Sequence, residues 1–287
     1  MDIGIGLPTT VPGTEGRTLV DWARHAEDAG FSTLGTIGRL VYPSYEELIA
    51  LSAAAAVTSR IRLTTGVLLA PLYTNAALLA KQAASLDRLS GGRLVLGLGL
   101  GGRDDDFAAS GLSTQGRGRR LDEQVAMMKQ VWSGEEFGDA GGIGPEPARP
   151  GGPEIILGGT TEASFRRVAR IADGWIMGGG TPDMFAQGAA AADKAWQDEG
   201  RAGRPRKLTL AYYALGPEAR SQADGYLLHY YGWLGDFAGQ IAAGAAVGAE
   251  MVRSYAAAFE ANGCDEIIFV PTASRLDQVS LLAEAMA

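Results

Sequence analysis

The sequence predicts an α/β fold, a single (β/α)8 TIM barrel over residues 1–287 with a helical insertion before the last strand. The first observation is the stretch Ile61–Gly102, which reads as a buried strand, a helix and a second buried strand. Strands that are apolar on both faces are typical of parallel sheets covered by helices. The second observation is that strand and helix patterns alternate about eight times along the chain, as they do in such a barrel. A doubly wound sheet is the structural alternative, because periodicity does not show whether a sheet closes.

The first half of the chain contains four strand–helix steps. Apolar strands are expected at Ile3–Leu7, Thr33–Ile37, Ile61–Leu69 and Leu94–Leu98. Helices are expected at Arg17–Ala29, from Ser44 to Val57, at Asn75–Leu89 and at about Gly118–Trp132. Gly30 ends the first helix. Ser44 and Glu47 have the spacing of a capping box at the start of the second.

The second half begins with a long loop, Gly134–Pro153, which is rich in glycine and proline. Strands are then expected at Glu154–Leu157, Trp175–Met177, Leu208–Leu215 and Glu266–Val270. The corresponding helices are expected at Thr161–Ala172, Pro182–Glu199 and Ala273–Ala287. The region Pro217–Asn262 also has helical character, but glycines interrupt it, and it forms the predicted insertion.

Composition excludes several classes of function. The chain has 287 residues, 46% of them hydrophobic, and a net charge of −8. A nucleic-acid partner requires a basic surface, and no apolar run is long enough to span a membrane. Cys264 is the only cysteine, so neither a disulfide framework nor a cysteine metal cluster is expected. The start of the chain lacks the pattern of a secretory signal, and we expect a cytoplasmic protein.

Two glycine-rich loops follow neighbouring strands at the end of the barrel where active sites form. Gly158-Gly159-Thr160-Thr161 follows the fifth predicted strand, and Gly178-Gly179-Gly180-Thr181 follows the sixth. Glycine lets the backbone approach a phosphate, whose charge the free amides at a helix start can bind. We interpret the pair as one phosphate cradle. The alternative is that these glycines only permit tight turns between strand and helix.

A third glycine pattern, Gly97-x-Gly99-x-x-Gly102, fits a dinucleotide-binding motif on the fourth strand. The run Asp104–Asp106 follows it, and three carboxylates there would repel a pyrophosphate. We therefore reject a Rossmann interpretation. The acids have a simpler role at the start of a helix, where negative charge is favoured, and a site for a hard cation is the weaker alternative.

Histidine is scarce, and conventional catalytic groups are few. His25 is expected on the solvated side of the first helix, and His229 lies within the aromatic segment Tyr226–Trp233. That segment is interpreted first as ordinary packing and second as the lining of a pocket for a flat substrate. Neither a Ser-His-Asp set nor metal-ligand spacing can be assembled. Such a barrel suits an enzyme whose cofactor performs the chemistry.

Six segments together resemble one family. They are GIGLP at 4–8, AEDAGFSTL at 26–34, SRIRLTTGVLLAPL at 59–72, LLAKQAASLDRLSGGRLVLGLGLGG at 78–102, RGRRLDEQ at 117–124, and ILGGTTEASFRRVARIADGW just after the long loop. In this order they resemble the luciferase-like monooxygenase family, whose members are flavin- or F420-dependent oxidoreductases. The resemblance covers most of the first 180 residues and fades beyond Met184. It implies a TIM barrel, a cofactor that is FMN or coenzyme F420, and usually a homodimer.

The resemblance also implies roles for particular residues. Thr65, Gly66 and Val67 match the bulge on the third strand against which the flavin ring rests, where F420-using relatives have a non-prolyl cis bond. The residues that match the backbone holding the cofactor phosphate are Gly158, Gly159, Thr160, Gly178 and Gly179. Arg119 and Arg120 lie in the family's RGRR element, where ion pairing and cofactor contact are equally open.

One departure from the family concerns the end of the second strand. Many relatives have a histidine or an Asp-His pair there, whereas this chain has Gly38-Arg39. A general base is therefore missing, because arginine stays protonated. Arg39 could pair with an anionic substrate, with a flavin oxygen or with a nearby acid. Arg39 and His229 are the catalytic candidates, and the candidates for substrate contact are Tyr42, Tyr230 and Trp233.

The expected function is that of a monooxygenase that uses oxygen and reduced FMN, supplied by a separate reductase, on a small organic substrate. An F420-dependent reductase or dehydrogenase is the alternative. A phosphate-binding isomerase or aldolase is more remote, because the lysines that a Schiff base would need (Lys81, Lys129, Lys194 and Lys207) lie on predicted helices or strand edges. A barrel that binds ligands without turnover is the last possibility. The expected homodimer would associate through small apolar residues of Leu48–Ala56 and Ala76–Ala84.

Overall fold

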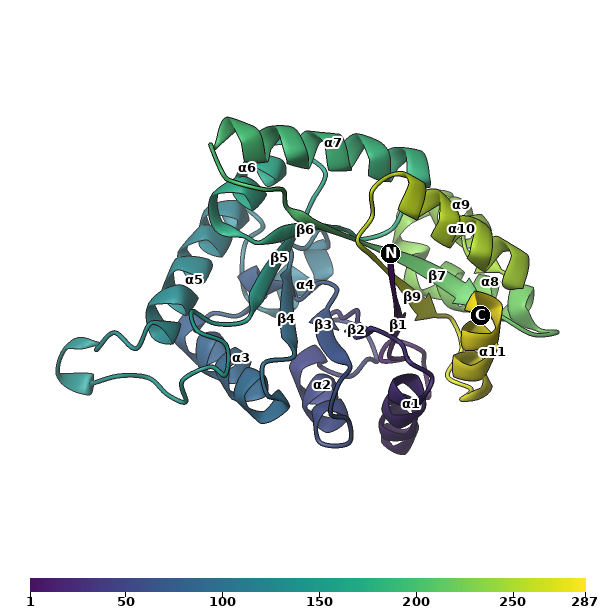
Figure 1. Ribbon diagram of the computed structural model, residues 1–287, viewed down its shortest axis with the longest axis horizontal. Helices are drawn as coiled ribbons and strands as arrows, with labels where there is room; N and C mark the ends of the chain where they lie inside the picture. Colours follow the sequence, from purple (N-terminus) through teal and green to yellow (C-terminus); the bar gives the residue numbers. More distant parts are fainter.

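Parallel strands close into a barrel in the computed structural model, which describes residues 1–287 (Figure 1). In chain order the barrel strands are β1 (Asp2–Gly6), β2 (Thr33–Thr36), β3 (Arg62–Thr65), β4 (Leu94–Leu98), β5 (Glu154–Gly158), β6 (Gly174–Met177), β7 (Arg206–Ala214) and β9 (Glu266–Pro271). Strand β1 pairs with both β2 and β9, and β7 pairs with both β6 and β9. The sheet therefore has no free barrel edge, which confirms the (β/α)8 prediction over the doubly wound alternative.

Helices surround the barrel on its outer side, as Figure 1 shows. They are α1 (Gly16–Asp28), α2 (Glu47–Ala55), α3 (Ala76–Ser90), α5 (Arg117–Trp132), α6 (Glu162–Ile171), α7 (Pro182–Asp198), α10 (Ala249–Ala261) and α11 (Asp277–Met286). Helix α1 buries its predicted inner face of Leu19, Trp22, Ala23 and Ala26. Full burial of one large apolar side chain contributes about 1.5–3 kcal/mol, so these faces hold the helices on the sheet.

The strands are apolar on both faces because they separate two cores. On β5, Ile155 and Leu157 belong to the core between strands and helices, whereas Ile156 belongs to the core inside the barrel. Val95 on β4 and Ile268 on β9 fill the same interior. The interior of the barrel is therefore packed, and a ligand can bind only at its ends.

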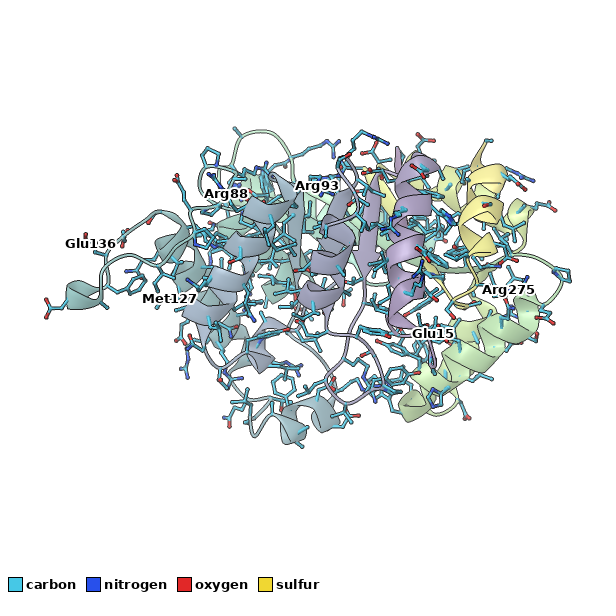
Figure 2. The ribbon with its side chains drawn as sticks, turned by 90° about the horizontal axis from the view of Figure 1, so that it is seen from below. Glu15, Arg88, Arg93, Met127, Glu136 and Arg275 are labelled. Atoms are coloured by element: carbon cyan, nitrogen blue, oxygen red, sulfur yellow. The ribbon has the colours of Figure 1, made fainter.

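The two ends of the barrel can be followed in Figure 2, where Glu15 and Arg93 lie at opposite edges. Glu15 comes after β1 and directly before α1, so it marks the end at which strands lead into helices. Arg93 directly precedes β4 and marks the other end. At that other end lies Cys264, buried just before β9 with its Sγ donating to the carbonyl oxygen of Glu266 at 3.2 Å. This is the structural role that its sequence context favoured.

The predicted start of α2 is wrong. The N-cap of this helix is Glu46, whose carboxylate accepts from the backbone N–H of Ile49 at 2.7 Å. Ser44 instead donates its hydroxyl to the carbonyl oxygen of Arg39. The chain is still extended at Glu46, so the helix begins two residues too late for a capping box at Ser44.

Strand β3 is shorter than the expected Ile61–Leu69. Its ladder ends at Thr65, the Gly66-Val67 peptide bond is cis, and a 3-10 turn, η1 (Ala70–Leu72), follows. The backbone N–H of Gly66 still donates to the carbonyl oxygen of Thr36 at 2.7 Å. The residues after Thr65 stay apolar because this segment packs over the end of the barrel. Hydrophobicity alone does not distinguish such a segment from a continuing strand.

A helical insertion separates β7 from β9, as predicted. It contains α8 (Ala219–Tyr230), η3 (Gly232–Leu234), α9 (Phe237–Ala243), the two-residue strand β8 (Ala246–Val247) and then α10. Strand β8 was not predicted, and it pairs with the end of β7. A further short helix, α4 (Asp104–Ala109), has the three consecutive aspartates in its first turn, as the charge argument anticipated.

The segment 134–153 is a loop, as expected, and it projects from the barrel with Glu136 near its tip (Figure 2). It contains a short turn, η2 (Gly138–Ala140), and a bridge between Glu136 and Gly142. In the whole structure, no helix is both long and apolar enough to cross a bilayer.

Candidate functional site

A cleft of about 430 Å³ opens at the end of the barrel where strands lead into helices. Its wall combines residues that follow five strands with residues of the insertion. Among the residues singled out from the sequence, it contains Arg39, Val67, Gly158, Gly159, Gly178, Tyr230 and Trp233. Segments far apart in the chain thus meet in one concave site, which is the usual form of a small-molecule site.

One side of the cleft is a shelf formed by Val67. Of the three residues predicted to support a flavin ring, only Val67 lines the cleft. Thr65 is fully buried and donates its hydroxyl to the carbonyl oxygen of Gly97 at 2.7 Å, so it joins β3 to β4 beneath the shelf. Gly66 lies behind Val67, where a Cβ would be 3.2 Å from the carbonyl oxygen of Thr36. The shelf is therefore apolar and held firmly from below.

The glycine pattern on β4 serves this shelf. A Cβ at Gly97 would lie 1.9 Å from the carbonyl oxygen of Thr65, and one at Gly99 would lie 2.5 Å from the Val67 side chain. Both positions need glycine because β3 and its continuation pack directly against them. This explains the pattern without dinucleotide binding and agrees with the rejection of a Rossmann site.

The loop after β5 forms the adjoining part of the cleft wall, since a Cβ at Gly158 would lie 3.6 Å from the Val67 side chain. Gly159 has φ +136, and a Cβ there would lie 2.4 Å from the hydroxyl oxygen of Ser164. Thr161 is the N-cap of α6 and accepts from the backbone N–H of Ser164 at 3.2 Å. The indole N–H of Trp175 donates to the carbonyl oxygen of Gly159 at 2.8 Å and fixes the loop. Thr160 is exposed and does not line the cleft.

The loop after β6 lies beside it. Gly178 lines the cleft, and a Cβ at Gly178 would meet no atom within 4 Å. Gly179 has φ +122 but is not part of the wall. Thr181 is the N-cap of α7. Two capped helix starts therefore follow two glycine loops at the same cleft, an arrangement that suits the anionic tail of a cofactor.

Arg39 is occupied by acids of α4. Its guanidinium donates to the carboxylate of Asp105 at 2.8 Å and lies 3.7 Å from that of Asp106. The guanidinium also lies 5.3 Å from the ring centroid of Tyr42 and 5.7 Å from that of Tyr230. Among the three partners considered from the sequence, the nearby acid is the one that the structure provides.

A second arginine connects α4 to the insertion. The Arg103 guanidinium lies 4.4 Å from the ring centroid of Trp233 and pairs with Asp105 at 2.9 Å. The hydrogen bond from Arg103, with the charges of Arg103 and Arg39, lowers the pKa of Asp105 to about 2 against the opposing effect of burial. Two arginines thus pair with Asp105 and Asp106 of this acidic run. No group of three acidic, histidine or cysteine residues is arranged to hold a metal ion.

His229 does not line the cleft. Its Nδ1 is 2.7 Å from the hydroxyl oxygen of Tyr42, and its side chain is exposed. It lines a shallower neighbouring pocket of about 450 Å³, together with Tyr42, Tyr230 and Trp233. The three substrate candidates are therefore brought together, and the imidazole is their neighbour rather than a group facing the shelf.

The other basic candidates do not line the cleft. Arg119 is exposed and lies 3.6 Å from Glu123, and Arg120 contacts the carbonyl oxygen of Ser113. Lys207 lies on β7, and its Nζ forms an ion pair with the carboxylate of Asp193 at 2.7 Å. The other three lysines considered for a Schiff base point to backbone carbonyls or an acid on the outside of the barrel. No lysine is available for an aldolase mechanism in this cleft.

Glu47 is an ionisable residue near the site whose role sequence reasoning missed. Its side chain is buried, and the hydroxyl of Thr36 donates to its Oε2 at 2.9 Å. Burial raises the pKa of Glu47 to about 8, although the Thr36 hydrogen bond opposes the rise. A Cβ at Gly38 would lie 2.7 Å from the Glu47 Cγ, so the glycine makes room for the acid. The sequence held one sign of this burial, because Glu47 shares a helix face with the apolar residues Ala50 and Leu51.

Comparison with known proteins agrees with this geometry. A family model described as luciferase-like monooxygenase matches residues 1–275. An uncharacterised protein of Mycobacterium tuberculosis is 36% identical over 171 residues, which are 56% of this chain and 60% of that protein. F420-dependent glucose-6-phosphate dehydrogenase of Amycolatopsis mediterranei is 27% identical over 211 residues, 64% of this chain and 63% of that enzyme. The chain thus matches less than two thirds of the length of these curated relatives.

Solved structures with the same fold cover nearly the whole chain. Monooxygenase RslO1 from Streptomyces bottropensis has a TM-score of 0.79 at 23% identity, covering 100% of this chain and 98% of that one. An F420-dependent secondary alcohol dehydrogenase in complex with an F420-acetone adduct has a TM-score of 0.84 at 15% identity, covering 99% of this chain and 97% of that one. The shared fold, together with the family match over nearly the full length, leads to one conclusion: the chain belongs to the luciferase-like monooxygenase family.

Proposed function

We propose that the protein is a monooxygenase that uses reduced FMN and oxygen on a small organic substrate. The observation that supports this best is the cleft, whose wall combines the apolar shelf of Val67 with the glycine loops at Gly158-Gly159 and Gly178. A flat ring system fits against a shelf with few side chains, and its phosphate fits against free amides at helix starts. Reduced FMN would supply the electrons for oxygenation, and a separate reductase would supply the reduced FMN.

The residues of the chain would bind and orient the cofactor and would shield it from water. Val67 would support the ring, and the loops after β5 and β6 would hold the phosphate. Tyr230 and Trp233 of the insertion would cover the mouth and limit the entry of water. Arg39 is paired with Asp105, so it would shape the wall rather than exchange protons.

An F420-dependent reductase or dehydrogenase is the second candidate. One observation favours it: a sequence relative at 27% identity is named as an F420-dependent dehydrogenase. The same cleft would accept this cofactor, because its ring is also flat and tricyclic and its side chain also carries a phosphate.

Titration of the purified protein with reduced FMN and with reduced F420, each without oxygen, tests both candidates. Tight binding of reduced FMN, followed by oxygen consumption when air and substrate are admitted, would support the first. Binding of F420 alone would move the assignment to the second. Binding of neither would overturn both.

A further inference from the structure

A recess of about 320 Å³ lies beside the cofactor cleft. It is formed between the segment that follows β2 and the segment that follows β3. Gly38, Arg39 and Leu69 line both the recess and the cleft. A molecule in the recess would therefore border whatever occupies the cleft.

The only buried carboxyl group in the recess wall is that of Glu47, whose residue is 5% exposed. Its Oε2 accepts a hydrogen bond from Thr36, and its Oε1 has no hydrogen-bond partner. A Cβ at Gly38 would lie 2.9 Å from Oε1. The unpartnered oxygen thus lies against the glycine shared by recess and cleft, with no side chain between them.

Burial and the neighbouring Glu46 favour the neutral form of Glu47, against the opposing hydrogen bond from Thr36. Thr36 on β2 is its hydrogen-bond donor, and the carboxylate of Glu46 on the same helix start raises its pKa further. Tyr73, after β3, and Tyr230, from the insertion, both have pKa values raised by burial, so neither ionises near neutral pH. The Glu47 carboxyl, with a pKa of about 8, therefore has a proton to donate at neutral pH.

The remaining lining of the recess disfavours anions. Its only cation is Arg39, which is already paired with Asp105. Glu46 contributes a carboxylate, and Leu40, Leu69 and Leu72 contribute apolar surface. A ligand that is uncharged and mostly apolar fits these walls, because an anion would be desolvated without a free partner.

We propose that this recess binds the substrate, and that Glu47, as a neutral acid, donates a hydrogen bond to a carbonyl oxygen of an uncharged aldehyde or ketone. Glu47 would thus determine specificity and would polarise the carbonyl next to the cofactor. The inference rests on the proposed function only for the statement that a redox cofactor occupies the adjoining cleft. It excludes phosphorylated and sulfonated substrates.

The test is an NMR titration of the full chain with cyclohexanone and with cyclohexanecarboxylate, from about pH 6 to about pH 9. A group with a pKa of about 8 is roughly one-tenth protonated at about pH 9, so the affinity for cyclohexanone should fall about tenfold over this range. Glu47→Gln keeps a neutral donor and should bind the ketone with no pH dependence. Glu47→Leu should bind it weakly at every pH. Glu250→Gln, which removes an exposed acid on α10, should behave as the wild type.

Several outcomes would overturn the proposal. These are no binding of cyclohexanone by the wild type, affinity independent of pH in the wild type, or tighter binding of the carboxylate. If Glu47→Leu does not fold, the loss of pH dependence in Glu47→Gln still decides the question. Because no cofactor is added, failure here is separate from failure of the cofactor titration, which tests the proposed function.

Discussion

At the scale of single residues, the pairing of Gly38 with Glu47 could not be predicted from the sequence. Family resemblance draws attention to Gly38 as a missing base, and a glutamate nine residues later reads as a helix-start acid. The two are connected only by a contact in which the glycine leaves space for the carboxyl group. For Arg39 the sequence left three partners open, and the position of α4 supplies the acid.

Glu47 should also make folding stability depend on pH. Its folded pKa of about 8 lies above the ordinary value of 4.5, so the folded state binds a proton that the unfolded state has lost between these values. The stabilising contribution is complete below about pH 4.5 and is progressively lost as the pH rises to about 8. Each pH unit between these two pKa values changes the free energy of unfolding by about 1.4 kcal/mol. Urea unfolding of the wild type and Glu47→Gln should show an advantage for the variant that grows with pH across this window, whereas parallel curves would contradict it.

Gly178 offers the cleaner test of cofactor placement. Its Cβ would meet no neighbour, so Gly178→Val should leave the thermal midpoint unchanged while the side chain enters the cleft. We expect the affinity for the cofactor to fall roughly tenfold or more, which is about 1.4 kcal/mol. Gly239→Ala on α9, where a Cβ also meets nothing, is the matched control. Equal affinity in the parent and Gly178→Val would place the cofactor elsewhere.

Gly159 is a poorer position for this test than its sequence context suggested. A side chain there would collide with Ser164, and its φ of +136 is one that other residues rarely adopt. Substitution would disturb the start of α6, so weaker binding could not be separated from altered structure.

At the scale of elements, prediction succeeded where local pattern decides the outcome. The barrel strands, the outer helices and the insertion all follow from apolar periodicity and glycine breaks. Prediction failed where a contact between residues distant in the sequence determines whether an element forms or where it ends. Strand β8 forms where β7 extends beyond its pairing with β6, which ends at Thr209, and leaves an edge at Tyr213 and Ala214. The end of β3 at Thr65 depends in the same way on how the next segment packs against β4.

The insertion and α4 meet across the mouth of the cleft through Trp233 and Arg103. Trp233→Ala should raise KM for the substrate several-fold, because a cation–π contact worth about 0.5–2 kcal/mol is lost and the mouth becomes open. Cofactor affinity should change little, since the shelf and the phosphate loops remain. Steady-state kinetics beside a cofactor titration would check this. Phe237→Ala removes a similarly exposed aromatic side chain on α9 and should leave both values unchanged.

At the scale of the whole molecule, strands that are apolar on both faces predicted a parallel sheet, and about eight alternations of strand and helix predicted a barrel. Closure itself depends on β1 pairing with β9 from opposite ends of the chain. No local pattern specifies that pairing. At the amino ends of the strands, buried Glu266 accepts from Ser32, Arg62 and Arg206. This network joins β9 to β3 and β7, which are far apart in the chain, and only the closed fold assembles it.

The expected homodimer remains a prediction, and two exposed side chains give it a test. Ile49 on α2 is 66% exposed and Leu78 on α3 is 51% exposed. If these helices associate, light scattering at micromolar concentration should give twice the chain mass of 29.9 kDa, and Ile49→Glu with Leu78→Glu should give the single mass. A wild-type mass near 29.9 kDa would contradict the dimer.

The projecting loop has a practical consequence for spectroscopy. Its contacts with α3 lie near its return to the barrel, where Lys81 and Asp87 hold Gly144 and Ala148. The tip around Asp139 is exposed and distant from them in sequence. The only native thiol, Cys264, is buried with a pKa raised to about 12, so it should resist alkylation. Asp139→Cys should therefore accept a single maleimide dye, and its fluorescence would report rotation of the molecule while the end that carries the cleft stays unlabelled.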